Sequence, residues 1–255
     1  MTLPDLSMMK LGRKAVKRDS RTLRMSAYFT SALPPAPPSV DWTKGLSTFG
    51  MMLNDQHGCC TIAGIGHAIQ IFTHCCGKAP VTVPDSTVLE YYEKWDGYNP
   101  LDPTTDQGGI ELDVLNAWRA SDFSGHKLAA YVSVTPHITQ HVKQGMNLFG
   151  GLYIGISLPN TAQTQTVWDL PTGQFDPNDA LPDSWGGHCV FAVGYDADGV
   201  TVVTWGALKK MTWAFWNTYV DEAYCLLSPD FLNESGASPL GFNFTQLQTD
   251  LAQIN

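Results

Sequence analysis

The chain has 255 residues, a net charge of −9, 44% hydrophobic residues and 15% charged residues. This composition is typical of a globular protein and excludes disorder over most of the chain. No apolar run approaches the length of a membrane-spanning helix. The length allows one large domain or two small ones, with ample residues for a buried core.

The charge is unevenly distributed. Residues 1–24 contain seven basic and two acidic residues, a net charge of +5, whereas the rest of the chain carries −14. The acidic body argues against a nucleic-acid-binding core. A short basic arm has three candidate partners, namely phosphate, an acidic partner protein or a neighbouring subunit, and the acidic body of its own chain.

A proline-rich segment follows the arm. Four of the five residues Pro34–Pro38 are prolines, which predicts a stiff, extended spacer. We therefore expect a basic arm with its spacer over residues 1–38, a compact domain over 39–228 and a C-terminal extension over 229–255. The arm lacks the apolar segment and cleavage site of a signal peptide.

The first half of the expected domain is helical. The first predicted helix, residues 58–76, has an apolar stripe that includes Ile62, Ile65 and Ile69. Gly64 and Gly66 weaken this helix because glycine has a low helix propensity. Their presence indicates that another segment packs closely against the helix. Three more helices are predicted, over residues 85 or 86 to 95, 110–120 and 137–148.

The second half favours strands. Short β-rich runs cover residues 152–158, 189–195, 200–205 and 223–227, and Asp196–Gly199 is typical of a hairpin turn. A short surface helix is predicted over 243–253. Because helices precede an antiparallel sheet, the predicted fold class is α+β.

Cys60 and His188 are the candidate catalytic pair. A cysteine at a helix start is favoured as a thiolate, the nucleophilic form, by the helix dipole and unpaired N–H groups. His188 starts an apolar strand, where an imidazole can accept the thiol proton. Cys59 is a rival nucleophile. The alternatives for the pair are a structural thiol and a core histidine.

An ordered set of motifs resembles the papain-like cysteine peptidases over about residues 39–228. Val40-Asp41-Trp42 is similar to the start of their mature domain, and Asn54 to Cys60 is similar to their oxyanion-hole and nucleophile segment. The later matches are Asp106-Gln107-Gly108-Gly109, residues 137–156, residues 186–196, Trp205-Gly206 and Trp213 to Leu227.

The resemblance implies a papain-like fold, with a helical N-terminal half that holds a long nucleophile helix and a C-terminal half built on an antiparallel sheet or barrel. It implies a cysteine hydrolase in which Cys60 is the nucleophile, His188 the base, and Asn54 an oxyanion donor together with the Cys60 N–H. The alternative for Asn54 is an Asx turn. The residues expected to border the substrate cleft are Gly108, Gly109, Tyr153, Gly187 and Trp205.

The sequence also departs from the family pattern. Val203 stands where the family has the asparagine that orients the histidine, and Thr204 offers a hydroxyl if the register slips by one. Thr61 replaces the tryptophan after the nucleophile. The family's disulfide near the active site has no counterpart, since its positions are His57 and Asp106, which agrees with a reducing compartment.

These departures support an alternative hypothesis. The whole chain also resembles uncharacterised papain-like proteins of bacteriophages and prophages, so the alternative is a virion or assembly protein with weak or no catalysis. A cell-wall amidase is a third possibility. We expect a peptide or protein substrate, no membrane partner, and a location in the bacterial cytoplasm or the virion.

No cofactor or metal is expected. Cys60, His67 and His74 recur every seven residues, which places them two helical turns apart, too far to share one zinc ion. Cys189 and Cys225 are interpreted as small buried core residues.

Overall fold

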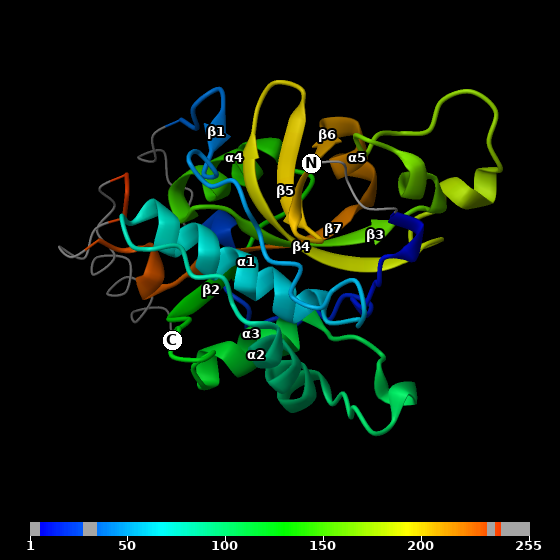
Figure 1. Cartoon of the computed structure of the whole chain (residues 1–255). Coiled ribbons are helices and arrows are strands. Elements are labelled where there is room, and N and C mark those ends of the chain that lie inside the picture. The colour runs from blue at the N-terminus through cyan, green and yellow to red at the C-terminus, as the bar shows by residue number, and fades with distance from the viewer. Residues whose placement is uncertain (1–5, 28–34, 234–237, 241–255) are drawn as a thin grey trace.

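The computed structural model describes residues 6–27, 35–233 and 238–240 (Figure 1). The α-helices of this part are α1 (Cys60–Cys75), α2 (Asp85–Tyr91), α3 (Glu111–Ala120), α4 (Thr139–Phe149) and α5 (Trp213–Tyr219). A π-helical turn, Tyr92–Asp96, continues α2 and ends at Gly97, whose φ of 79° few other residues adopt. In Figure 1, α2 and α3 lie on one side of α1, and β5, β6 and α5 lie on the other.

The strands form one antiparallel sheet. They are β1 (Val40–Asp41), β2 (Ala130–Ser133), β3 (Leu152–Leu158), β4 (Gly186–Tyr195), β5 (Gly199–Thr204), β6 (Ala207–Thr212) and β7 (Val220–Leu227). Their order is β2-β7-β3-β4-β5-β6, and β1 pairs with β4. The α+β prediction is confirmed.

Most predicted elements are present, with shifted ends. Strand 152–158 has the predicted bounds, the first helix begins two residues later than predicted, and β4 begins three residues earlier. The turn at Asp196 closes the β4–β5 hairpin, where its N–H donates to the Gly199 carbonyl. Strands β1, β2 and β6 and helix α5 were not predicted. The helix predicted over 243–253 lies outside the described residues.

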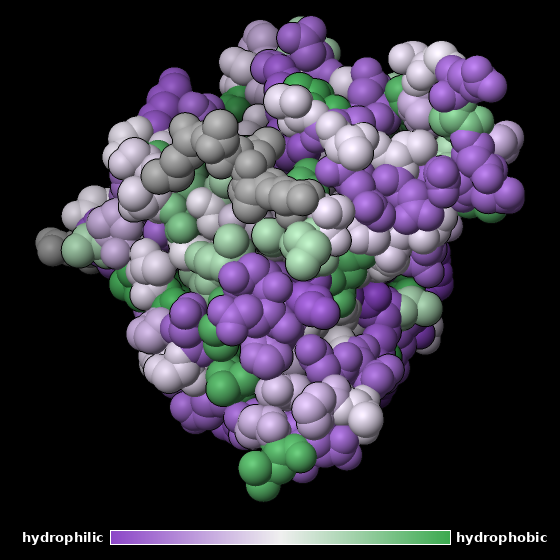
Figure 2. All heavy atoms as spheres, turned by 45° about the vertical axis from the view of Figure 1, so that its right-hand side comes forward, coloured by the Kyte–Doolittle hydropathy of each residue, from purple (hydrophilic) through white to green (hydrophobic). Residues whose placement is uncertain are grey.

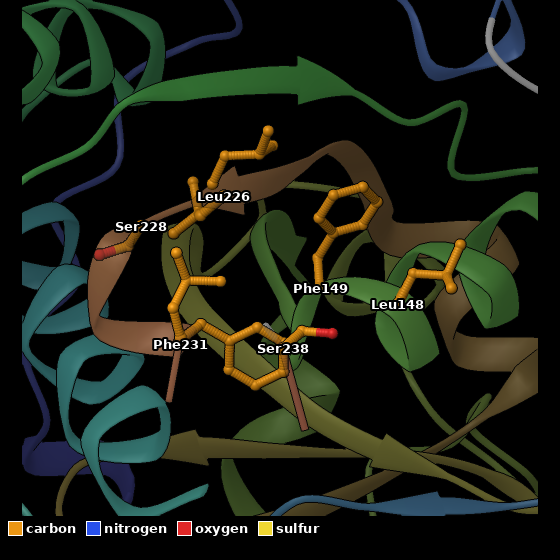
Figure 3. A pocket seen from close by; sticks show the side chains of 8 residues that line it. Leu148, Phe149, Leu226, Ser228, Phe231 and Ser238 are labelled. Carbon is orange, nitrogen blue, oxygen red and sulfur yellow. The ribbon is translucent and has the colours of Figure 1, made fainter. Parts of the chain in front are cut away.

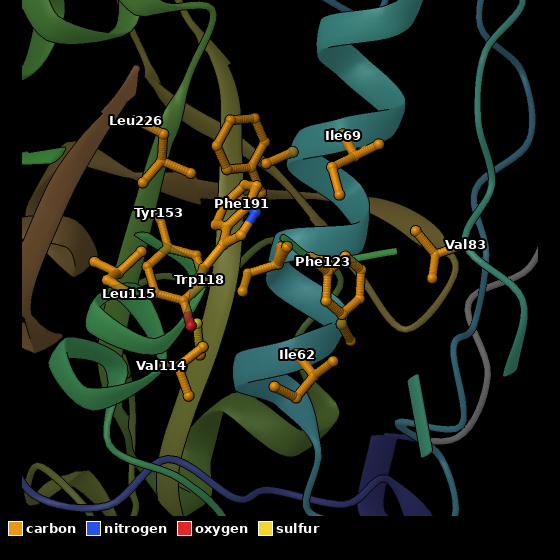
Figure 4. Close-up of a cluster of buried hydrophobic side chains, with 14 of the residues drawn as sticks. Ile62, Ile69, Val83, Val114, Leu115, Trp118, Phe123, Tyr153, Phe191 and Leu226 are labelled. Atoms are coloured by element: carbon orange, nitrogen blue, oxygen red, sulfur yellow. The ribbon is translucent and has the colours of Figure 1, made fainter. Parts of the chain in front are cut away.

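The sheet separates two apolar cores. Along β4, Cys189, Phe191 and Val193 belong to the core under α1, whereas Val190 and Ala192 belong to the core on the opposite face. This alternation follows from the two-residue period of a strand. Figure 4 shows the first core, where Ile62 and Ile69 of α1 and Leu115 and Trp118 of α3 gather around Phe191 and Tyr153.

Helix α1 lies unusually close to the sheet because Gly64 has no side chain. A Cβ added at Gly64 would lie 2.9 Å from Cε2 of Tyr153 and 3.2 Å from Sγ of Cys189. The expectation that another segment packs against the glycines of this helix is therefore confirmed. The contact sets how near the start of α1 approaches β4.

The outer surface is mixed in character. On the face drawn in Figure 2, hydrophilic residues predominate and hydrophobic ones are scattered between them. Within the described residues, no helix combines the length and the apolar character needed to cross a bilayer.

We predict that Gly64→Val destabilises the protein, because the added methyl groups overlap Tyr153 and Cys189. The expected loss in the free energy of unfolding is about 3 kcal/mol, measured by urea denaturation. Glu90→Ala on the exposed face of α2 is the control, with an expected change within about 0.5 kcal/mol. Equal stability of the two variants would show that α1 does not depend on this close contact.

Candidate active site

Cys60 is the first residue of α1 and is fully buried. Its Sγ accepts a hydrogen bond from the backbone N–H of Cys189 at 3.4 Å. Since Cys189 follows His188 on β4, this bond joins the thiol to the strand that carries the histidine. The Cys59 thiol instead donates to the carbonyl of Met52. The structure thus brings Cys60, and not Cys59, to the histidine strand.

The His188 ring is held by two residues at the end of β5. Its Nε2 lies 2.7 Å from Oγ1 of Thr204, and its face stacks on Trp205 with ring centroids 4.3 Å apart. Its Nδ1 has no hydrogen-bond partner among the described residues. When Nε2 donates its proton to Thr204, Nδ1 carries the basic lone pair. Of the two residues considered from the sequence, Thr204 is therefore the one that contacts the imidazole, while Val203 is buried in the core.

A tight turn explains this arrangement. Trp205 and Gly206 connect β5 to β6, and both have positive φ, 47° and 71°. Two such residues are typical of a type I′ hairpin turn, which glycine adopts freely and tryptophan rarely does. The turn places the indole of Trp205 over the imidazole. The indole Nε1 also donates to the carbonyl of Lys10 in the basic arm, at 3.3 Å.

The basic arm lies across Cys60. The Gly109 N–H donates to the Gly12 carbonyl and the Lys14 N–H donates to the Gly109 carbonyl, both at 2.8 Å. On the other side, the Arg13 N–H donates to the Gly187 carbonyl at 3.0 Å. Gly109 and Gly187 were predicted to border a substrate cleft, and here they bind an extended segment of the chain itself.

Glycine is required where the arm passes the nucleophile helix. A Cβ on Gly12 would lie 1.8 Å from the carbonyl oxygen of Gly58, and one on Gly108 would lie 1.8 Å from the carbonyl oxygen of Gly12. Both distances are far below van der Waals contact. The arm is therefore seated against the start of α1 and the Gly108 loop with no room for a side chain.

Burial favours the uncharged forms of the candidate pair. Burial raises the pKa of the Cys60 thiol to about 12, although N–H groups of Cys189 and Gly12 that bind the sulfur oppose the shift. Burial, followed by the charge of Arg13, lowers the pKa of His188 to about 3. At neutral pH, the arm-bound state therefore holds a thiol and a neutral imidazole.

Tyr153 and Asn54, two of the predicted site residues, are both buried. Tyr153 is fully buried in the core, and its hydroxyl donates to the Thr61 carbonyl at 2.9 Å, so it supports α1 from below. This corrects its expected place along the cleft. The buried side chain of Asn54 donates through Nδ2 to the His57 carbonyl at 3.3 Å, a local bond across the turn before α1.

A polar contact joins the two positions of the family's disulfide. Nδ1 of His57 lies 3.6 Å from Oδ2 of Asp106. The other Asp106 oxygen accepts hydrogen bonds from the Gly58 N–H at 2.9 Å and from the Tyr92 hydroxyl at 2.6 Å. The nucleophile loop and the Gly108 loop are thus connected without a covalent bond. All six cysteines are free.

The sequence analysis missed the site of the Arg13 side chain. The guanidinium contacts Glu222 at 2.9 Å, Asp221 at 2.8 Å and the Ser157 hydroxyl at 3.1 Å. Glu111, at the start of α3, is buried nearby. These partners come from three separate elements, and the only sequence signal was the opposite charge of the arm and the body.

The remaining candidates carry no comparable chemistry. In the described part of the chain, no group of three His, Cys, Asp or Glu residues could hold a metal ion. His67 and His74 each bind a backbone carbonyl, of Gly50 and Lys44 respectively. A small apolar hollow between α4 and β7, into which Phe149 and Phe231 point, has no titratable group among its lining residues (Figure 3).

Comparisons with solved structures identify the fold. Xylellain, a cysteine protease of Xylella fastidiosa, superposes with a TM-score of 0.63 at 16% identity, over 89% of this chain and 98% of that one. The chain has the papain-like fold. No family model matches the sequence, and no curated protein is significantly similar to it.

Further papain-like structures show the same likeness. The digestive procathepsin L 3 of Tenebrio molitor has a TM-score of 0.57 and 15% identity, over 87% of this chain and 77% of that one. A cysteine protease of Carica candamarcensis, solved in complex with E-64, has 0.51 and 14%, over 74% and 98%. At these identities the comparisons establish the papain-like fold of this chain.

We predict that Gly12→Ala releases the arm and exposes Cys60, because the added methyl group overlaps the Gly58 carbonyl. Burial is the largest cause of the raised thiol pKa, so hydration lowers it toward the ordinary value of about 8.5 or below. Iodoacetamide should then alkylate Cys60 at neutral pH faster in the variant, by a factor of about ten or more.

The control for this experiment is Met8→Ala, since Met8 lies on the same arm and its side chain is largely exposed. Its pH profile of alkylation should match that of the parent, with the inflection well above pH 9. If Gly12→Ala also keeps the parent profile, the arm does not control access to the thiol.

Proposed function

We propose that the protein is a cysteine peptidase in which Cys60 is the nucleophile and His188 the general base. The observation that carries the proposal is the position of His188, with Nε2 held by Thr204, its face covered by Trp205 and Nδ1 without a partner. Its neighbour Cys189 binds the Cys60 sulfur. The papain-like fold is consistent with this role.

The reaction begins when the arm leaves the cleft. His188 takes the thiol proton, and the Cys60 sulfur attacks the carbonyl carbon of a peptide bond. The Cys60 N–H at the start of α1, with Asn54 after its bond to His57 rearranges, stabilises the oxyanion. The C–N bond breaks as His188 gives its proton to the leaving amine. A water molecule, deprotonated by His188, then hydrolyses the thioester and restores the thiol.

The substrate class follows from what the cleft already binds. Backbone groups of Gly109 and Gly187 make three hydrogen bonds to an extended segment of the arm. Backbone bonds of this kind suit a peptide better than a small amide, which supports a peptidase over an amidase. The alternative of a bacteriophage assembly protein stays a prediction.

A thiol probe tests the proposal. E-64 is expected to modify Cys60 in the Gly12→Ala protein, and mass spectrometry after digestion identifies the site. Cys75 and Cys76 are partly exposed and serve as internal controls, since a merely accessible thiol would react there first. Cys60→Ala should abolish both the labelling and any peptide hydrolysis. Labelling spread over Cys75 and Cys76, with Cys60 untouched, would contradict the proposal.

We predict that Thr204 is a positioning residue for His188. Thr204→Val removes the hydrogen-bond partner that Nε2 has among the described residues and should lower kcat on the order of 10²-fold with little change in KM. Thr204→Ser keeps the hydroxyl and should retain most of the activity. Both variants are measured in the Gly12→Ala background with a fluorogenic peptide. Equal loss in both would indicate that packing, and not the hydroxyl, is what matters.

A further inference from the structure

The Arg13 side chain occupies a polar cavity beside the catalytic pair. The side chain is only 2% exposed, and the Glu222 side chain only 5%. Glu222 and Asp221 make the two shortest contacts with the guanidinium, and both lie at the start of β7. Ser157, the third partner, lies near the end of β3. Ser157 also donates to Asp221, and Tyr224 donates to Glu222, so the carboxylates are fixed in place.

More carboxyl groups surround the guanidinium than it can pair with. Glu111 is fully buried, and neither of its carboxylate oxygens accepts a hydrogen bond from an N–H or O–H group of the described residues. Burial raises the pKa of Glu111, and the charge of Glu222 adds to the rise. Burial also raises the pKa of Glu222, although the charge of Arg13 opposes this shift. One guanidinium thus faces three carboxyl groups, an environment that strongly favours a cationic side chain.

The cavity also has the shape of an arginine side chain. A Cβ on Gly155 would lie 2.9 Å from Cδ of Arg13, and one on Gly187 would lie 3.3 Å from its Nε. The two glycines therefore leave room for the aliphatic stem. The backbone of the occupant is fixed at the same time, because the Arg13 N–H donates to the Gly187 carbonyl, next to His188.

We propose that Glu111, Asp221 and Glu222 form a guanidinium-binding pocket. Through this pocket the enzyme selects peptides that carry an arginine close to the bond that Cys60 attacks. The inference rests on the proposed peptidase function and names its substrate class. Arg13 is the internal occupant, and the residue before it, Gly12, packs against Gly58, which lies two residues before Cys60. When the arm leaves, the buried carboxyl groups lose their cation, and an arginine of the substrate replaces it.

Binding to an inactive protein tests the pocket independently of catalysis. The full chain carries Cys60→Ala, Gly12→Ala and Arg13→Ala, so that the arm is displaced and no bond is cleaved. Calorimetry compares a blocked Gly-Arg-Gly peptide with the same peptide containing citrulline, the uncharged isostere. The arginine peptide should bind more tightly by a factor of about ten or more.

Substitutions within the pocket complete the test. Adding Glu222→Gln and Asp221→Asn should bring the two affinities close to each other, whereas Asp198→Asn, in the exposed β4–β5 turn, should leave the preference intact. Equal affinities in the pocket-intact protein, or no detectable binding of the arginine peptide, would overturn the pocket. Labelling of Cys60 by E-64 is a separate result, so the two proposals fail separately.

If the Arg13→Ala chain does not fold, refolding gives the second measurement. The proposal then predicts that ethylguanidinium restores the native circular dichroism spectrum, whereas the neutral ethylurea does not. No recovery with ethylguanidinium, or equal recovery with both compounds, would overturn the proposal.

Discussion

The contact between the first turn of α1 and strand β4 determines the geometry around Cys60. Gly64 lets the helix approach Tyr153 and Cys189, and the Cys189 N–H reaches the Cys60 sulfur as a result. The same strand carries His188, whose ring the Trp205-Gly206 turn covers and Thr204 orients. A small change in the distance between helix and sheet would therefore displace the thiol from the histidine.

The charge of the arm acquires a specific meaning in the structure. Of the three candidate partners for the basic arm, the acidic body of its own chain is the one that binds Arg13. The guanidinium of Arg13 pairs with carboxylates at a buried site, where an unpaired carboxylate would be costly. Cys60 and His188 are both fully buried, and burial favours the neutral forms of both. In the proposed account, the arm-bound state thus combines a filled Arg13 site with an uncharged Cys60–His188 pair.

Local sequence patterns predicted much of the fold, but they could not predict its long-range contacts. The stripe along Ile62 and Ile65 and the turn at Asp196 depend on neighbours in sequence, and both elements were predicted. Strand β6 was missed because Lys209 and Lys210 interrupt its apolar pattern, although Lys209 is buried. Helix α5, with its run of aromatic residues, was read as part of a closing segment and not as a helix.

The candidate site divides in the same way. Cys60, His188 and the Thr204 alternative followed from motif order, and the structure places Thr204 on the imidazole. Tyr153 was misplaced because the sequence does not show that its face of β3 packs against α1. Arg13 and its partner Glu222 are separated by 209 residues, and no local pattern relates them. Only the tertiary structure shows that the arm, the start of α3 and the start of β7 meet.

The protonation of His188 tests the central claim most directly, which is that the arm holds the Cys60–His188 pair uncharged. Histidine labelled with ¹⁵N distinguishes imidazole from imidazolium by NMR, and His188→Gln assigns the signal. The account predicts a neutral ring at pH 5 in the parent, whose pKa is about 3, and an imidazolium at pH 5 in Gly12→Ala, where hydration restores the ordinary pKa of about 6.5 or higher. A ring that is charged in the parent, or that stays neutral in the variant after the arm has left, would contradict it.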